Sequence, residues 1–222
     1  MSDIRLIDVK EEIFADNDKR AADIRERLKA KGVFMLNLMA SPGAGKTSFI
    51  LQTLRGVKDT FRAAVIEGDI ESTVDSETVV KEGVPAVQLR TGGACHLDAF
   101  MVDKALDETD LNGLDLVIIE NIGNLVCPAE FDTGAVKNVM ILSVPEGDDK
   151  PLKYPLMFST CDVLVVNKID YLSLSDFNRE AVKARVFKLN PKMKIFEVSC
   201  KTGEGIPAWL EWLKSEIASF KK

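Results

Sequence analysis

The stretch MASPGAGKTS, residues 39–48, decides how the rest of the sequence is interpreted. It follows the apolar run 33–39 and nearly matches the phosphate-binding loop G-x-x-x-x-G-K-[ST]. The pattern predicts a strand, a tight loop at Gly43 and Gly45, and a helix that begins near Gly45. Ala40 is the departure, because the pattern has glycine there. Alanine costs little at this position if its φ is negative, and about 1 kcal/mol or more if φ is positive.

The side chains of this loop have distinct expected tasks. Backbone N–H groups and the helix N-terminus would bind phosphate oxygens, and Lys46 would reach the β- and γ-phosphates. The hydroxyl of Thr47 would bind Mg²⁺. The other residues expected to contact the nucleotide here are Gly43, Ala44, Gly45 and Ser48. The alternative is an ordinary glycine-rich turn, and the position directly after a strand argues against it.

Six further apolar runs follow, separated by segments with helical spacing. With 33–39 they predict seven strands, the others being 63–69, 86–90, 116–120, 139–144, 163–168 and 194–199. Nearly continuous apolar runs are typical of strands that helices cover on both faces. We therefore expect an α/β fold with a mostly parallel seven-stranded sheet and helices on both faces, as in P-loop NTPases. Ligands of such sheets bind at the carboxyl ends of the strands.

The segment 8–31, before the first strand, predicts an amphipathic helix. Its apolar residues recur at roughly helical spacing, and Gly32 is a stop signal. These apolar residues are Ile13, Phe14, Ala21, Ile24 and Leu28. We expect 1–32 to form an N-terminal helix packed on a nucleotide-binding domain, 33–222, within a single domain overall. Docking of a partner is the alternative role for this helix.

Charge and hydropathy exclude several classes of protein. The net charge of -6 argues against attraction to nucleic acid or to an anionic membrane. No stretch reaches the roughly 18 to 20 apolar residues that span a bilayer, and the first residues lack the apolar core of a signal peptide. We expect a cytoplasmic protein whose four cysteines are thiols or metal ligands, not disulfides.

The sequence NKID, residues 167–170, follows the apolar residues VLVV and indicates the base that is bound. In an N-K-x-D arrangement the aspartate accepts two hydrogen bonds from guanine N1 and N2, which adenine cannot offer. The lysine stem packs on the base. Asp170 would therefore contact guanine, with Asn167 and Lys168 shaping the pocket.

A second base-contacting segment is expected after the last strand. Ser199, Cys200 and Lys201 are similar to the last base-contacting loop of GTPases, with the backbone near Cys200 facing the guanine oxygen. Together with the phosphate loop and NKID, this segment favours GTP over ATP.

The end of the strand at 116–120 carries the next candidates. An ordinary GTPase would have D-x-x-G here, whereas this chain has Glu120 followed by Asn-Ile-Gly, so Glu120 would hold the magnesium shell through a water. The acidic segment after strand 63–69 offers Asp69 and Asp75 for magnesium and water contacts. The alternative for that segment is a solvated acidic helix start. Candidate catalytic residues for phosphoryl transfer are Lys46, Asp75 and Glu120.

Cys95, His96 and Cys127 follow two of the predicted strands and form a candidate metal site. If these strands end at the same sheet edge, two thiolates and an imidazole can converge on Ni²⁺ or Zn²⁺, with one ligand position left open. The alternative is an isolated polar histidine with two small buried thiols. Cys161 and Cys200 have no neighbouring ligand and are interpreted as packing residues.

The sequence ENIGNLVCPAEFD, residues 120–132, resembles the HypB family of hydrogenase-maturation GTPases, which help insert nickel. The same resemblance is carried by SPGAGKTS, NKID, TGGACHLDA (91–99) and GDDKPLKYP (147–155), and it runs from about Val33 to the C-terminus. Some members begin with a Cys-rich nickel motif or a His-rich tract. This chain has neither, so its metal handling would rest on the nucleotide-binding domain.

The resemblance implies a GTPase of the SIMIBI type with slow, regulatory turnover. Such a protein dimerises when it holds GTP and passes nickel to the hydrogenase large subunit with a HypA-type partner. The resemblance also implies that Cys95, His96 and Cys127 hold the metal and that Lys153 crosses to the partner's nucleotide site. Because Cys127 closely follows the loop at Glu120, nucleotide state would move a metal ligand.

Other readings remain open. One is a metal-binding protein in which the nucleotide is structural. Another is a GTPase chaperone for a different metalloenzyme, such as urease or a cobalamin enzyme. A plain ATPase is disfavoured by NKID.

Overall fold

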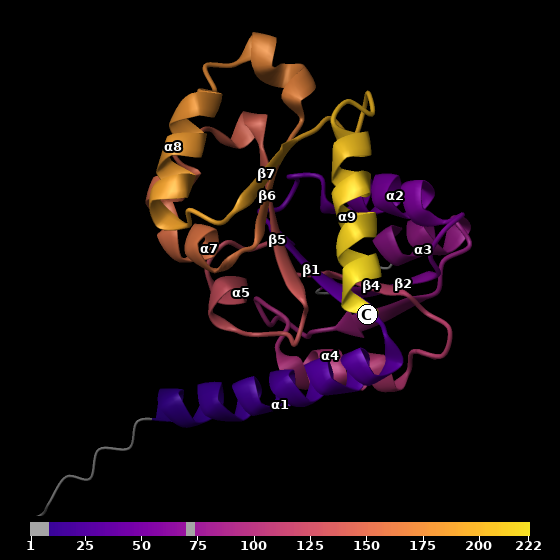
Figure 1. Ribbon diagram of the computed structural model, residues 1–222. Coiled ribbons are helices and arrows are strands. Elements are labelled where there is room, and N and C mark those ends of the chain that lie inside the picture. Colours follow the sequence, from indigo (N-terminus) through magenta and orange to yellow (C-terminus); the bar gives the residue numbers. More distant parts are fainter. Residues whose placement is uncertain (1–8, 70–73) are drawn as a thin grey trace, which may run out of the picture.

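A seven-stranded sheet forms the centre of the protein, as the sequence predicts (Figure 1). The computed structural model describes residues 9–69 and 74–222, without the side chains at 9–11, 69 and 74–77. Neighbouring strands all pair in parallel, in the order β3-β2-β4-β1-β5-β6-β7. Their ends lie within two residues of the predicted ones. The strands are β1 (Phe34–Ala40), β2 (Ala63–Asp69), β3 (Ala86–Arg90), β4 (Leu116–Glu120), β5 (Lys137–Ser143), β6 (Val163–Asn167) and β7 (Lys194–Glu197).

Helices cover both faces of the sheet, and short ones connect the strands near their carboxyl ends. The α-helices are α1 (Val9–Lys31), α2 (Lys46–Val57), α3 (Val74–Lys81), α4 (Ala99–Asp107), α5 (Cys127–Glu130), α6 (Lys150–Lys153), α7 (Pro155–Thr160), α8 (Arg179–Leu189) and α9 (Ile206–Phe220). Two 3-10 helices are η1 (Val144–Glu146) and η2 (Ile169–Leu174). None of the helices in the described ranges is long and apolar enough to cross a membrane.

Alternation along the central strand β1 divides the core between the two faces. Phe34, Leu36 and Leu38 face a cluster built with α2, α3 and α9. Met35 lies on the opposite face, in a cluster with α1 and α4. Met39 lies on that face too, in a third cluster with α7 and α8. The predicted continuous apolar run is therefore explained by burial on both faces.

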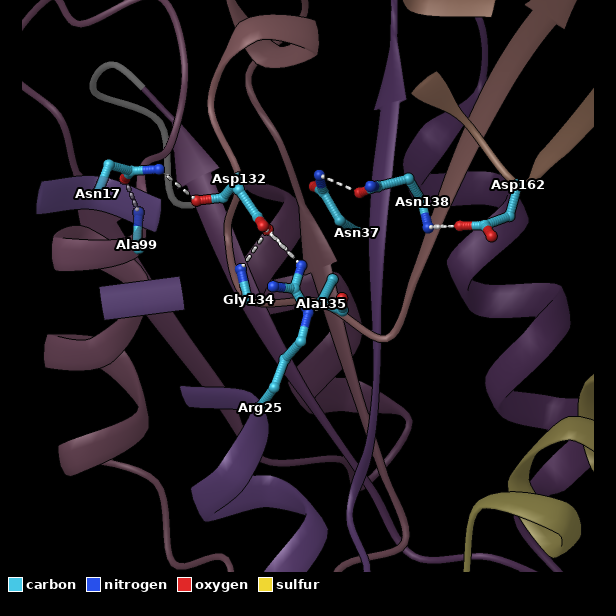
Figure 2. Close-up of polar contacts among 9 residues, drawn as sticks. All are labelled: Asn17, Arg25, Asn37, Ala99, Asp132, Gly134, Ala135, Asn138 and Asp162. Carbon is cyan, nitrogen blue, oxygen red and sulfur yellow. Dashed lines mark hydrogen bonds and ion pairs between the residues drawn. The ribbon is translucent and has the colours of Figure 1, made fainter. Parts of the chain in front are cut away.

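A row of asparagines lies between the cluster that contains Met35 and the cluster that contains Met39, on the same face of the sheet. The Nδ2 of Asn121 donates to Oδ1 of Asn37 at 3.0 Å, and Nδ2 of Asn37 donates to Oδ1 of Asn138 at 3.0 Å. The backbone N–H of Asn138 then donates to the carboxylate of Asp162 at 2.9 Å (Figure 2). Buried amides are costly unless they are paired, and here they satisfy one another. The row fixes β4, β1 and β5 side by side and orients Asn121 at the carboxyl edge.

Helix α1 packs along α4 on this face (Figure 1). Ala21, Ile24 and Leu28 are buried in the cluster with α4, as the helical spacing predicts. The placement of Ile13 on the buried stripe is wrong, since its side chain is 53% exposed. The stripe continues instead to Asn17, a polar residue that is 1% exposed. Helical spacing from the buried residues toward the N-terminus places position 17 on the same face of α1. Because asparagine is polar, the search for apolar residues did not assign it to that face.

Candidate nucleotide and metal sites

A cavity of about 550 Å³ opens at the carboxyl ends of β1, β2 and β4. Its walls come from the loop before α2, from Glu67 and Gly68 at the end of β2, and from the segment 120–123 after β4. Lys46 and Thr47, the first two residues of α2, both line it. A helix N-terminus, a lysine and glycine-rich backbone in one cavity form a site suited to phosphate.

The departure of Ala40 from the phosphate-loop pattern has a structural explanation. Ala40 is the buried last residue of β1, and its extended backbone accepts a side chain. Among the described non-glycine residues, Lys168 alone has a positive φ. The glycine requirement falls on Gly45, whose φ is +100° and whose added Cβ would lie 2.6 Å from Nδ2 of Asn167. The loop thus tolerates alanine at its start and needs glycine where it meets β6.

A second cavity, of about 220 Å³, continues from the first, because Gly45 and Ser48 line both. Its remaining walls are Asn167, Lys168, Asp170, Tyr171, Cys200 and Lys201. The NKID segment and the segment after β7 therefore meet across one pocket, as expected of two base-contacting loops. Together the two cavities can hold a triphosphate at one end and a base at the other.

Asn167 and Lys168 join the base pocket to the phosphate loop. Nδ2 of Asn167 donates to the carbonyl of Ala44 at 3.0 Å, and its Oδ1 accepts from the N–H of Cys200 at 3.3 Å. Lys168, held in the left-handed region at φ 62°, donates from Nζ to the carbonyl of Gly43 at 2.8 Å. These bonds fix the distance between the base and phosphate halves.

Asp170 is oriented by a neighbouring hydroxyl. Ser199, buried after β7, donates from Oγ to Oδ1 of Asp170 at 2.7 Å. The carboxylate is thereby held at the wall of the second cavity. Ser199 thus contributes by positioning the carboxylate expected to accept hydrogen bonds from guanine.

Thr47 and Glu120 offer oxygen ligands of the kind that Mg²⁺ prefers. Both residues line the phosphate cavity, where the Thr47 hydroxyl donates to Oε1 of Glu120 at 3.1 Å. The donor set therefore fits a magnesium ion next to bound phosphates.

The outcome differs for three other predicted nucleotide contacts. The side chains of Asp69 and Asp75 lie outside the described residues, so their predicted roles stay predictions. Lys153 is 59% exposed and pairs with Asp149 at 2.5 Å. It lines neither cavity, so the structure does not bring it to the nucleotide site of its own subunit.

Cys95, His96 and Cys127 converge as the sequence predicts. Their ligand atoms all lie within 4.8 Å of one another, and Sγ of Cys95 is 3.5 Å from Nδ1 of His96. Cys95 and His96 belong to the loop before α4, which we term the first ligand segment (94–99). Cys127 begins α5 and the second ligand segment (127–132). Two sulfurs and an imidazole suit Ni²⁺ or Zn²⁺.

The protonation states of this cluster reflect its surroundings. Burial lowers the pKa of His96, partly offset by the carboxylates of Asp98 and Glu130. The imidazole is therefore neutral and able to bind a metal at neutral pH. A hydrogen bond with the thiol of Cys127, with a further contribution from burial, raises the pKa of Cys95. In the absence of metal this thiol keeps its proton.

The two remaining cysteines lie apart from this cluster. Cys161 is fully buried in the core beside Met157, and burial raises its pKa. Burial also raises the pKa of Cys200 to about 11. Both are packed thiols, in agreement with the interpretation of the sequence.

Asn121 joins the nucleotide cavity to the metal cluster, and sequence reasoning assigned it no role. Its side chain is 0% exposed, and its Oδ1 accepts from the N–H groups of Ile122 at 2.9 Å and Leu97 at 3.0 Å. Ile122 lines the phosphate cavity, and Leu97 directly follows His96. Leu97 also packs closely on Gly68, where an added Cβ would lie 2.8 Å from the Leu97 side chain. One buried amide therefore connects the two sites.

Comparison with known proteins identifies relatives over nearly the whole chain. Residues 34–197 match the family model described as CobW/HypB/UreG, nucleotide-binding domain. The chain is 43% identical over 218 residues to the hydrogenase maturation factor HypB of Rhizobium leguminosarum bv. viciae, covering 98% of this chain and 73% of the relative. It is 42% identical over 211 residues to the hydrogenase/urease maturation factor HypB of Helicobacter pylori strain J99, covering 93% and 86%.

Solved structures agree with the fold. The crystal structure of HypB from Helicobacter pylori in complex with nickel has a TM-score of 0.87 at 41% identity, covering 93% of this chain and 97% of that one. A likeness in fold alone extends to the signal recognition particle receptor FtsY of Elizabethkingia anophelis, with a TM-score of 0.55 at 14% identity over 98% and 82% of the two chains. The expected α/β fold of the SIMIBI type is confirmed.

Proposed function

The chain belongs to the CobW/HypB/UreG family of nucleotide-binding domains, and on this basis we propose that it binds and hydrolyses GTP to control the delivery of nickel during hydrogenase maturation. The observation that carries the proposal is the cluster of Cys95, His96 and Cys127, connected to the phosphate cavity by Asn121. A protein in which the nucleotide were only structural would not need that connection. The crystal structure of the Helicobacter pylori relative in complex with nickel supports nickel as the metal that this cluster binds.

Hydrolysis would be a phosphoryl transfer assisted by positioning and charge. Lys46 and the N-terminus of α2 would neutralise charge that develops on the γ-phosphate oxygens. Thr47 and Glu120 would hold Mg²⁺, which supplies further positive charge at the phosphates. Asp75 and Asp69 remain proposed contacts of the attacking water and of magnesium.

Nickel would be held as cargo, in a site suited to release. Two thiols and one imidazole leave at least one ligand position for a solvent molecule or for a ligand of a second subunit or recipient. Cys95 is exposed, so a recipient can reach the metal directly. The proposed partners are a second copy of this chain in the GTP-bound state, a HypA-type nickel chaperone and the hydrogenase large subunit. Lys153 is proposed to reach the partner's nucleotide site across that dimer.

Urease is a second candidate recipient, because the Helicobacter pylori relative is named a hydrogenase/urease maturation factor. Activation of each recipient apo-enzyme by the nickel-loaded protein and GTP distinguishes the two.

The test of the proposal is a calorimetric titration of metal-free protein with Ni²⁺, once with GDP and once with a non-hydrolysable GTP analogue. We expect the two nickel affinities to differ by about fivefold or more, the usual size of such coupling. Cys127→Ala should weaken nickel binding by at least the roughly 10–100-fold that outer-shell changes cost. Cys161→Ala, which removes a buried thiol outside the cluster, is the matched control and should bind as wild type. Equal affinities in GDP and analogue would leave a GTPase with structural metal, and absent nickel binding would refute the delivery role.

A second variant tests the route between the sites. Asn121→Ala removes the acceptor shared by the N–H groups of Leu97 and Ile122. We expect it to bind Ni²⁺ but to lose most of the difference between GDP and the GTP analogue. Asn138→Ala is the matched control, because it breaks the same row at the far side of Asn37 and leaves both of those bonds and the bond between Asn121 and Asn37 in place. An undiminished difference in Asn121→Ala would contradict this route.

A further inference from the structure

Helix α1 reaches both segments that carry the metal ligands through two side chains on one face. Phe14 and Asn17 are three residues apart, a spacing that places them side by side on a helix. Phe14 contacts the ring of Phe131 with a centroid distance of 4.9 Å. Phe131 in turn stacks on His96, with centroids 3.9 Å apart and an interplanar angle of 23°. The imidazole is therefore backed by a ring that α1 supports.

Asn17 connects the two ligand segments to each other. Its Oδ1 accepts from the N–H of Ala99 at 2.9 Å, where the first ligand segment passes into α4. Its Nδ2 donates to the carbonyl of Asp132 at 2.9 Å, at the end of the second ligand segment (Figure 2). Both bonds are made inside the protein, since Asn17 is 1% exposed.

The chemistry of these bonds requires an amide at position 17. The N–H of Ala99 can only donate and the carbonyl of Asp132 can only accept. A carboxylate satisfies the first partner alone, and an apolar side chain satisfies neither. The buried stripe of α1 is otherwise apolar at Ala21, Ile24 and Leu28, so packing alone does not explain asparagine here.

Neighbouring contacts show that α1 holds the second ligand segment firmly. The guanidinium of Arg25 binds the carboxylate of Asp132 at 2.5 and 2.7 Å and donates from Nε to the carbonyl of Ala135 at 3.1 Å (Figure 2). At Gly134 the chain approaches α1 so closely that a Cβ would lie 2.8 Å from Ile24. Within this contact Asn17 is the residue that also bonds to the first ligand segment.

We propose that Asn17 is a positioning residue of the metal site, which sets the distance between the Cys95-His96 pair and Cys127 by bonding to both of their segments. The inference rests on the proposed binding of nickel at this cluster. Outer-shell partners commonly set the affinity of a site through the orientation of its ligands. Asn17 would therefore act on nickel and leave the nucleotide unaffected, since it contacts neither nucleotide cavity.

The test compares the full chain with Asn17→Leu, which keeps the number of side-chain heavy atoms and the branching at Cγ on the buried stripe and removes both hydrogen bonds. We expect Ni²⁺ affinity to fall by roughly 10–100-fold, with GDP affinity within about twofold of wild type. With Co²⁺ as a spectroscopic probe, the thiolate charge-transfer and d–d bands should shift or weaken. Asn17→Asp, a second variant that keeps the acceptor for Ala99 and loses the donor to Asp132, should show an intermediate nickel affinity.

Arg27→Ala provides the matched control. Arg27 attaches α1 to the far end of α4 through Asp107 at 2.7 Å and the carbonyl of Leu106 at 3.2 Å. Its loss loosens the same helix away from the ligands, so nickel affinity and the Co²⁺ spectrum should stay as in wild type. Wild-type nickel affinity and spectrum in folded Asn17→Leu or Asn17→Asp would overturn the positioning role, as would an equal loss in Arg27→Ala. Failure of the wild-type protein to bind Ni²⁺ would overturn the proposed function and this inference together.

Discussion

Replacement of Lys46 by alanine is expected to lower GTP turnover by at least about a hundredfold, the usual cost of removing one group that stabilises transition-state charge. Lys46 is the first residue of α2 and lines the phosphate cavity beside Thr47. Its ammonium group would lie where negative charge builds up on the transferring phosphoryl group. Release of inorganic phosphate under single-turnover conditions measures the effect.

Lys58→Ala is the matched control for this result, because Lys58 is exposed at the other end of the same helix. It should turn over GTP as wild type. Turnover within twofold of wild type in Lys46→Ala, with the protein folded and GTP bound, would show that the cavity at α2 is not the hydrolytic site. That result would favour the alternative in which the nucleotide is only structural.

Replacement of Asp170 by asparagine is expected to exchange guanine for xanthine specificity. Two hydrogen bonds to a charged group, worth roughly 1.5–3 kcal/mol each, would be lost from guanine N1 and N2. GDP affinity should therefore fall by a factor of roughly 150 to 25,000. The Oδ1 of the asparagine can still accept a hydrogen bond from the Ser199 hydroxyl, and its NH₂ group can donate one to the 2-oxygen of xanthine.

Competition of GDP, XDP and ADP against a fluorescent guanine nucleotide measures this exchange. The wild-type protein should prefer GDP, and Asp170→Asn should prefer XDP. Asp176→Asn, an exposed carboxylate shortly after η2, is the matched control and should keep the preference of wild type. Unchanged GDP affinity in Asp170→Asn would place the base elsewhere, and tighter binding of ADP than of GDP by the wild-type protein would favour an ATPase.

The proposed positioning by Asn17 and the proposed coupling by Asn121 act on the first ligand segment from two sides. Asn121 bonds to Leu97 from the nucleotide side, and Asn17 bonds to Ala99 from α1. Loss of Asn121 should change how nickel affinity depends on nucleotide, whereas loss of Asn17 should change nickel affinity in every nucleotide state. The two variants therefore separate the structure of the metal site from its control.

The sequence by itself determined the fold and which candidate residues lie together at the carboxyl ends of the strands. Apolar runs covered by helices specify a parallel sheet, and the phosphate loop and NKID lie at strand ends, so topology brings Lys46 and Asp170 to one edge. The same reasoning predicted that Cys95, His96 and Cys127 would meet, and their ligand atoms do. Local patterns suffice here because strand ends converge whatever the details of packing.

Only the tertiary structure decided how these sites are supported and connected. Asn17 bonds to residues 82 and 115 positions away, and Asn121 bonds to Leu97, 24 positions before it. Helical periodicity places Asn17 on the buried stripe of α1 but does not indicate its hydrogen-bond partners, and polarity argues against placing an asparagine in the core. Ile13 shows the converse, since an apolar side chain at helical spacing is exposed where α1 extends beyond its contacts with the core. Burial of a polar residue is favourable only when distant partners complete its hydrogen bonds, and those partners are set by the folded chain.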